Sequence, residues 1–191
     1  MSAENATTSQ PKATDVCKNV PLDRPIRKLL SEEMSAVEFV KLLEKEAHFN
    51  EAVRVVAAML PVRERVWWAC QCARQSLPAE ATAEVDIALQ TAERWVTEMT
   101  EEARLSAHAT ALALEPTTAA SLAAMAAFTS SGNISPPEAP HPITAPPEVS
   151  AQYVAGSVLV SALLPDPRDA PGRFRTFLQQ GIELHNSLNA Q

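Results

Sequence analysis

The sequence has few glycines, and that shortage argues against several kinds of enzyme. Only 4 of the 191 residues are glycine, which leaves little material for a loop that wraps phosphate groups. Neither a P-loop pattern nor the GxSxG pattern of serine hydrolases is present. The chain also lacks glycine-rich hairpin signals and the apolar/polar alternation of a half-buried strand. These absences favour an all-α fold and argue against phosphate or hydrolase chemistry.

Basic residues and long apolar runs are scarce as well. Lysine and arginine number 16 against 23 aspartates and glutamates, and the net charge of −7 argues against a general nucleic-acid-binding surface. The longest apolar stretches, near residues 53–61 and 154–165, are shorter than the roughly 20 residues that cross a bilayer. Residues 1–20 lack the apolar segment of a signal peptide. We therefore expect a cytoplasmic protein that contacts neither nucleic acid nor membrane.

The apolar pattern predicts a compact multi-helix domain of about six to eight helices packed as helical hairpins. Ser35 and Glu38 form a capping-box pattern, and Asn50, Thr100, Thr118 and Ser150 are expected to begin later helices. The expected helices span about residues 35–47, 50–60, 62–76, 81–98, 101–114, 118–130, 150–164 and 170–187.

Composition divides the chain into a tail, a domain and one long connection. Residues 1–20 are polar and lack an apolar period, so we predict a disordered tail there and a single helical domain over residues 21–191. Residues 133–149 contain six prolines and are predicted to adopt polyproline II conformation. We expect this segment to be a strap across the helices, although a peptide ligand for a partner is the other interpretation.

The helix expected over residues 62–76 carries the most informative side chains. Trp67 and Trp68 are neighbours and point about 100° apart, so both are covered only if helices pack on two sides. With Trp95 they are expected to lie in the core. Arg63 and Glu64 are expected to form a buried ion pair that anchors this helix.

Acidic residues outnumber arginines by eight to two between residues 80 and 115. A solvated helical face is the simplest interpretation of such a charge run. A docking surface for a basic partner is the functional interpretation, because the field of the carboxylates would steer that partner. The residues we select as candidates for partner binding are Glu98, Glu101, Glu102 and His141.

The three cysteines provide a weak case for thiol or metal chemistry. Cys70 and Cys72 are about 200° apart on a helix and cannot share one metal from it, so two small buried hydrophobes are the favoured interpretation. Cys17 makes the count odd, which does not suggest a disulfide framework. The alternative is a small metal- or thiol-dependent enzyme that uses Glu64, Cys70 and Cys72, with His48 as a further ligand. We predict no cofactor and no metal.

Several segments resemble an uncharacterised bacterial family, the domain-of-unknown-function family 6931, from about residue 35 to 188. They are LPVRERVWWACQCAR over residues 60–74, AERWV over 92–96 with TEE over 100–102, AAMAAF over 123–128, AGSV over 155–158 and RFR over 173–175. The tryptophan segment is the most specific of these. Thr129 departs from the aromatic residue expected at its position. The resemblance implies that the gene for this chain lies near genes of type VI secretion. It implies no catalytic residues.

These observations lead to the hypothesis that the protein binds a partner and catalyses no reaction. We expect a non-catalytic protein-interaction module, an accessory, adaptor or effector chaperone of a bacterial type VI secretion system, with a secretion component or effector as its partner. The metal- or thiol-dependent enzyme and a homo-oligomeric structural scaffold remain as alternatives.

Overall fold

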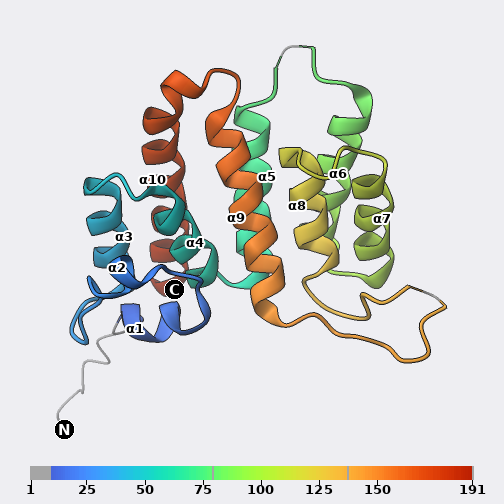
Figure 1. Cartoon of the computed structure of the whole chain (residues 1–191). Coiled ribbons are helices and arrows are strands. Elements are labelled where there is room, and N and C mark those ends of the chain that lie inside the picture. Colours follow the sequence, from blue (N-terminus) through green and yellow to red (C-terminus); the bar gives the residue numbers. More distant parts are fainter. Residues whose placement is uncertain (1–9, 79, 137, 191) are drawn as a thin grey trace, which may run out of the picture.

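A computed structural model describes residues 10–78, 80–136 and 138–190, and these residues are mainly helical, with no β-strand among them (Figure 1). Within these ranges, no helix combines the length and the apolarity needed to cross a membrane. The elements are α1 (Ala13–Val16), η1 (Cys17–Asn19), α2 (Arg24–Arg27), α3 (Ala36–Lys45), α4 (Phe49–Met59), α5 (Val62–Gln75), α6 (Ala83–Glu98), α7 (Glu101–Leu112), α8 (Ala119–Phe128), α9 (Pro147–Leu163), η2 (Pro167–Asp169) and α10 (Ala170–Asn189).

Side-chain caps fix several helix starts as the sequence predicts. Ser35 and Glu38 form the capping box of α3, and Thr100 and Thr118 accept hydrogen bonds at the starts of α7 and α8. Two expected caps are wrong. Helix α4 begins at Phe49 rather than after Asn50, and α9 begins at Pro147 because proline fits the first helical turn.

Helix α9 lies at the centre of the molecule. It packs against α4, α5, α8 and α10, so it joins the two sides of the fold (Figure 1). Helices α3, α4 and α10 form one side, and α6, α7 and α8 form the other. Ser150 and Ser157 of α9 are buried, and their hydroxyls donate to the carbonyls of Ala126 and Ala119. These bonds satisfy the buried hydroxyls and fix α9 to α8.

Part of the predicted disordered tail is ordered. Residues 10–20 contain α1 and η1, and Ala13, Cys17 and Val20 are buried at the spacing of one helical face. Backbone bonds from Ala13 N to the Met34 carbonyl and from Ala36 N to the Pro11 carbonyl, both 2.9 Å, attach this segment beside α3. Residues 1–9, the rest of that tail, lie outside the described residues.

The two neighbouring tryptophans have different environments. Trp68 is fully buried, as is nearly all of Trp95, but Trp67 is 42% exposed, so the expected core position of Trp67 is wrong. The side chains point about 100° apart, and only the Trp68 side faces α10. The expected buried ion pair is also wrong, because Arg63 is exposed and donates to the carbonyl of Val96 at 2.8 Å, while Glu64 is half-buried.

The proline-rich segment does not lie across the helices as expected. It projects as a loop between α8 and α9 (Figure 1). Asn133 explains this, because its side-chain oxygen accepts from Ser135 N at 3.1 Å and Ile143 N at 2.9 Å. A bridge between Asn133 and Thr144 closes the loop at its base. Pro137 lies outside the described residues.

Candidate functional site

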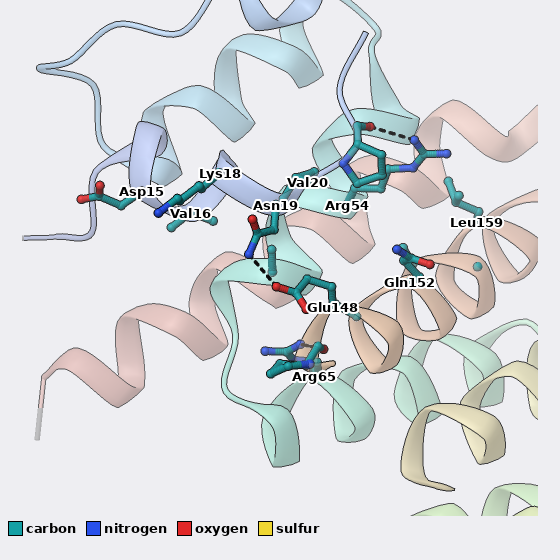
Figure 2. Close-up of a pocket in the computed structure, with 16 residues that line it drawn as sticks. Asp15, Val16, Lys18, Asn19, Val20, Arg54, Arg65, Glu148, Gln152 and Leu159 are labelled. Carbon is teal, nitrogen blue, oxygen red and sulfur yellow. Dashed lines mark hydrogen bonds between the residues drawn. The ribbon is translucent and has the colours of Figure 1, made fainter. Parts of the chain in front are cut away.

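A groove of about 700 Å³ lies between the N-terminal segment and the helices α4, α5 and α9 (Figure 2). This volume falls within the range of roughly 300–1,000 Å³ that is typical of ligand sites. The residues that line the groove are Asp15, Val16, Lys18, Asn19, Val20, Pro21, Arg54, Ala58, Arg65, Pro147, Glu148, Ala151, Gln152, Ala155, Gly156 and Leu159.

One face of α9 forms the longest wall of the groove. Glu148, Ala151, Gln152, Ala155 and Leu159 recur three or four residues apart and therefore share that face. Two of these five side chains are alanines, whereas the glutamate, the glutamine and the leucine extend farther from the helix. The small side chains leave the space open in front of the helix.

The opposite wall is the segment that contains η1. The guanidinium of Arg54 in α4 donates from Nη1 to the Pro21 carbonyl at 3.0 Å. Asn19 donates from Nδ2 to Oε1 of Glu148 at 2.5 Å, and this bond joins the segment to the first turn of α9 (Figure 2). These two bonds hold the N-terminal segment against α4 and α9, so its residues are part of the site.

The groove contains charges of both signs. Lys18, Arg54 and Arg65 are its cations, and Asp15 and Glu148 are its carboxylates. Arg65 donates from Nε to the Leu60 carbonyl at 2.9 Å and from Nη1 to the Pro147 carbonyl at 3.3 Å. Burial lowers the pKa of Arg65 below its ordinary value, and the charge of Glu148 opposes that change. The site thus combines small apolar side chains with guanidinium groups.

The residues predicted to bind a partner lie elsewhere and are mostly engaged within the chain. Arg94 pairs with Glu98 at 2.9 Å and with Glu102 at 3.1 Å, and Arg104 pairs with Glu101 at 2.7 Å. Hydrogen bonds from Arg94 and Arg104 lower the pKa values of Glu98 and Glu101, respectively. His141 is exposed in the proline-rich loop. In the described part of the chain, no hydrogen bond or ion pair joins His141 to these glutamates.

The cysteines are buried and separated from the groove. Cys17, Cys70 and Cys72 are free thiols with no exposed surface. Burial raises the pKa of Cys17 to about 11 and raises those of Cys70 and Cys72 well above the ordinary value of 9.0. His48 is half-buried at the start of α4. Among residues 10–78, 80–136 and 138–190, no three histidine, cysteine or acidic side chains are grouped to hold a metal ion.

The groove residues were not selected from the sequence, although Arg54 gave a signal. It is the one charged residue within the apolar run from Ala52 to Leu60. A guanidinium in such a helix must reach the surface or a polar partner, because burying an unpaired charge is costly. Arg65 and Glu148 gave no comparable signal, since their neighbourhood depends on the packing of distant segments.

The fold and the groove define an all-α protein with a ligand-sized groove between η1, α4 and α9. Residues 39–185 match the model of a family of unknown function (DUF6931), and the chain belongs to that family. No curated protein and no solved structure matches the chain. The resemblance drawn from the tryptophan segment is therefore confirmed at the level of the family.

Proposed function

We propose that this chain is a non-catalytic protein-interaction module that binds a segment of a partner protein in the groove between η1, α4 and α9. The groove itself is the observation that carries the proposal, because it has the size of a ligand site and is lined by side chains of many different kinds. The small residues Ala151 and Ala155 let a bound backbone approach α9 closely.

The family resemblance and the composition support a biological setting for this module. We propose that it acts in the bacterial cytoplasm as an accessory, adaptor or effector chaperone of a type VI secretion system. Reduced, buried thiols are consistent with that compartment. In this role the groove would hold a segment of an effector or of a secretion component until it is transferred.

Peptide selection with the purified full chain tests groove binding directly. A library of displayed random peptides is selected on the immobilised protein, and the enriched peptides are synthesised and measured by fluorescence anisotropy. Gln152→Trp places a bulky ring in the groove, whereas Gln179→Trp makes the same change at an exposed site on α10. We expect the first variant to weaken peptide binding by roughly tenfold or more, a difference of about 1.4 kcal/mol, and the second to leave binding unchanged.

Two results would overturn this proposal. One is a selection that yields no peptide whose binding depends on Gln152. The other is a dimer, detected by light scattering, that Gln152→Trp dissociates, because a second copy of the chain would then occupy the groove. Circular dichroism and thermal melting of both variants establish that each one is folded.

A further inference from the structure

Helix α7 buries small apolar residues and exposes large ones. Its buried face carries Ala103, Ala107 and Ala111, whereas Leu105 and Leu112 on the other side are 48% and 70% exposed. A helix at the surface of a globular protein normally turns its large apolar residues toward the core and its polar residues toward water. The reversed arrangement marks the outer face of α7 as a contact surface.

The exposed leucines belong to one stripe along the helix. Leu105, Ala109 and Leu112 are four and then three residues apart, so their side chains share a face, and all three are exposed. Helix α7 lies at the edge of the molecule, where it packs against α6 and α8 (Figure 1). The spacing of the stripe is that of the anchor residues through which amphipathic helices pack against a partner.

The charge of this part of the chain determines which partner fits. Residues 75–167, which include α6 to α9, contain eleven aspartates and glutamates but only two arginines and no lysine. The rest of the chain is close to balance, with fourteen lysines and arginines against twelve carboxylates. The excess negative charge is therefore concentrated in the part of the chain that contains α7.

The arginines that reach this part do not offset its charge. Arg104 is 1% exposed and pairs with Glu101 at 2.7 Å, so it lies beneath the surface. Arg94 and Arg74 are each shared between two carboxylates, which are Glu98 and Glu102 for the first and Asp86 and Glu93 for the second. Each shared arginine leaves one negative charge uncompensated.

Carboxylates flank the stripe at both ends. Glu101 and Glu102 precede it and Glu115 follows it, and all three are exposed. A second copy of the chain on this face would bring these carboxylates against its own in either orientation, and like charges across an interface are unfavourable. A partner that carries lysine or arginine beside its apolar residues is instead favoured by the same arrangement.

We propose that the stripe of Leu105, Ala109 and Leu112 is a docking surface for a basic amphipathic helix of a partner protein. The surface is separate from the groove between η1, α4 and α9, so this inference goes beyond the proposed function. The apolar side of the partner helix covers the two leucines, and its lysines or arginines lie beside Glu102 and Glu115. The leucines provide buried area, and the carboxylates steer the positively charged partner.

Selection of helical peptides on the purified full chain tests the inference. A displayed library is built on an alanine-rich helix with one face randomised, and the enriched peptides are synthesised and measured by fluorescence anisotropy. We expect them to combine large apolar residues at helical spacing with an excess of lysine or arginine, and their affinity to fall as salt is raised. Enriched peptides without excess basic charge would overturn the inference.

Variants of the chain locate the contact. Leu112→Ser removes a leucine of the stripe, and Leu29→Ser is the control, because Leu29 is a 38% exposed leucine that follows α2. Glu115→Lys reverses a charge beside the stripe, and Glu183→Lys makes the same change at an exposed site on α10. We expect each stripe variant to bind the basic peptide roughly tenfold or more weakly, and each control to bind it nearly as the unmodified chain does. Thermal melting establishes that every variant is folded.

Three outcomes would overturn the docking surface and leave the groove to its own test. One is a selection that yields no peptide whose binding depends on Leu112. Another is a set of peptides whose binding depends on Gln152 instead, because they would occupy the groove. The third is a dimer, detected by sedimentation equilibrium, that Leu112→Ser dissociates, because a second copy of the chain would then cover the stripe.

Discussion

The indole Nε1 of Trp68 donates a hydrogen bond to the backbone carbonyl of Phe177, 3.0 Å away, and joins α5 to α10. The two residues are 109 positions apart in the sequence, and both are buried. Because the indole N–H has a partner, the large tryptophan ring sits in the core without an orphaned polar group. This contact ties the C-terminal helix to the centre of the fold.

Replacing Trp68 is therefore expected to destabilise the protein strongly. Trp68→Ala removes a fully buried ring, and we expect a loss of roughly 3–5 kcal/mol in the free energy of unfolding. Trp67→Ala is the matched control, because the neighbouring ring is 42% exposed and its loss should change stability far less. Urea denaturation followed by circular dichroism measures both. Equal destabilisation by the two variants would contradict this difference in burial.

Trp67 and Trp68 also show which parts of the fold can be predicted from the sequence. Local chemistry determines helix starts, so Ser35 and Thr100 were identified from their own and adjacent residues. Burial of Trp68 rather than Trp67 depends on α10, which lies about a hundred residues away in the chain. Nothing local distinguishes the two tryptophans. The ordered segment around Cys17 was missed for the same reason, because its apolar residues are few and α1 packs against the distant helices α3 and α4.

Gly181 marks a close approach between α10 and the core. A Cβ at this position would overlap Cγ1 of Val56 and lie 3.2 Å from the Trp68 ring. We expect Gly181→Ala to cost roughly 1–3 kcal/mol through overpacking, despite the better helix propensity of alanine. Gly172→Ala in the same helix is the control, because nothing lies within 4 Å of its added Cβ. That change is expected to be neutral or stabilising by up to about 1 kcal/mol.

A second substitution tests whether Val56 is the cause. Val56→Ala removes the overlapping methyl group, so the double variant Val56→Ala/Gly181→Ala should be more stable than the sum of the two single effects predicts. Thermal unfolding of the four proteins gives the coupling energy. Strict additivity would show that the strain at position 181 has another source.

Arg104 is the buried residue that attaches the proline-rich loop. Its side chain is 1% exposed, and its guanidinium donates to the carbonyls of Phe128 at 2.7 Å and Asn133 at 3.0 Å. Arg104→Met keeps much of the volume but leaves these carbonyls without that donor. We expect a loss of roughly 2–4 kcal/mol, since an unsatisfied buried polar group costs about 1–3 kcal/mol.

A local measurement separates this role of Arg104 from a general loss of stability. Limited proteolysis should cut residues 133–146 faster in Arg104→Met than in the unmodified chain, under conditions where both are folded. Arg94→Met is the control, because Arg94 makes exposed ion pairs with Glu98 and Glu102 and should change neither stability nor cleavage appreciably. Unchanged cleavage of the loop in Arg104→Met would contradict the attachment.

The candidate site was less predictable than the fold, and the acidic residues show why. Counting charges along residues 80–115 selected Glu98 and Glu102, yet both face Arg94 once the chain folds. The groove instead combines residues 15–21, 54–65 and 147–159, which are adjacent only in the folded chain. Linear charge patterns therefore overstate how much negative charge is available to a partner.

His108 and His185, whose pKa values are lowered by burial, predict a loss of stability in mild acid. Burial lowers the pKa of His185, and burial together with the charge of Arg104 lowers that of His108, both from 6.5. The unfolded chain binds protons below pH 6.5 while the folded chain resists them, so the free energy of unfolding falls as pH decreases. The carboxylates of Glu98 and Glu101, with ordinary values of 4.5, contribute only at lower pH.

Urea titrations between neutral pH and pH 5 measure this loss. The double variant His108→Asn/His185→Asn should have a flatter dependence on pH over that interval, because neither replacement titrates. His141→Asn is the control, since His141 is exposed in the proline-rich loop. A double variant with the same slope as the unmodified chain would assign the acid sensitivity to other groups.

The thiols give a test of the metal- or thiol-dependent alternative. Because Cys70 and Cys72 are buried and their pKa values are raised, we expect no rapid reaction of the folded protein with an aromatic disulfide reagent near pH 8. All three cysteines should react once the chain is unfolded in denaturant. The folded thiols keep their protons above pH 9.0 whereas unfolded thiols lose them, so stability should also decrease as pH rises beyond that value. A rapid reaction of Cys70 or Cys72 in the folded state would contradict their burial and support thiol chemistry at α5.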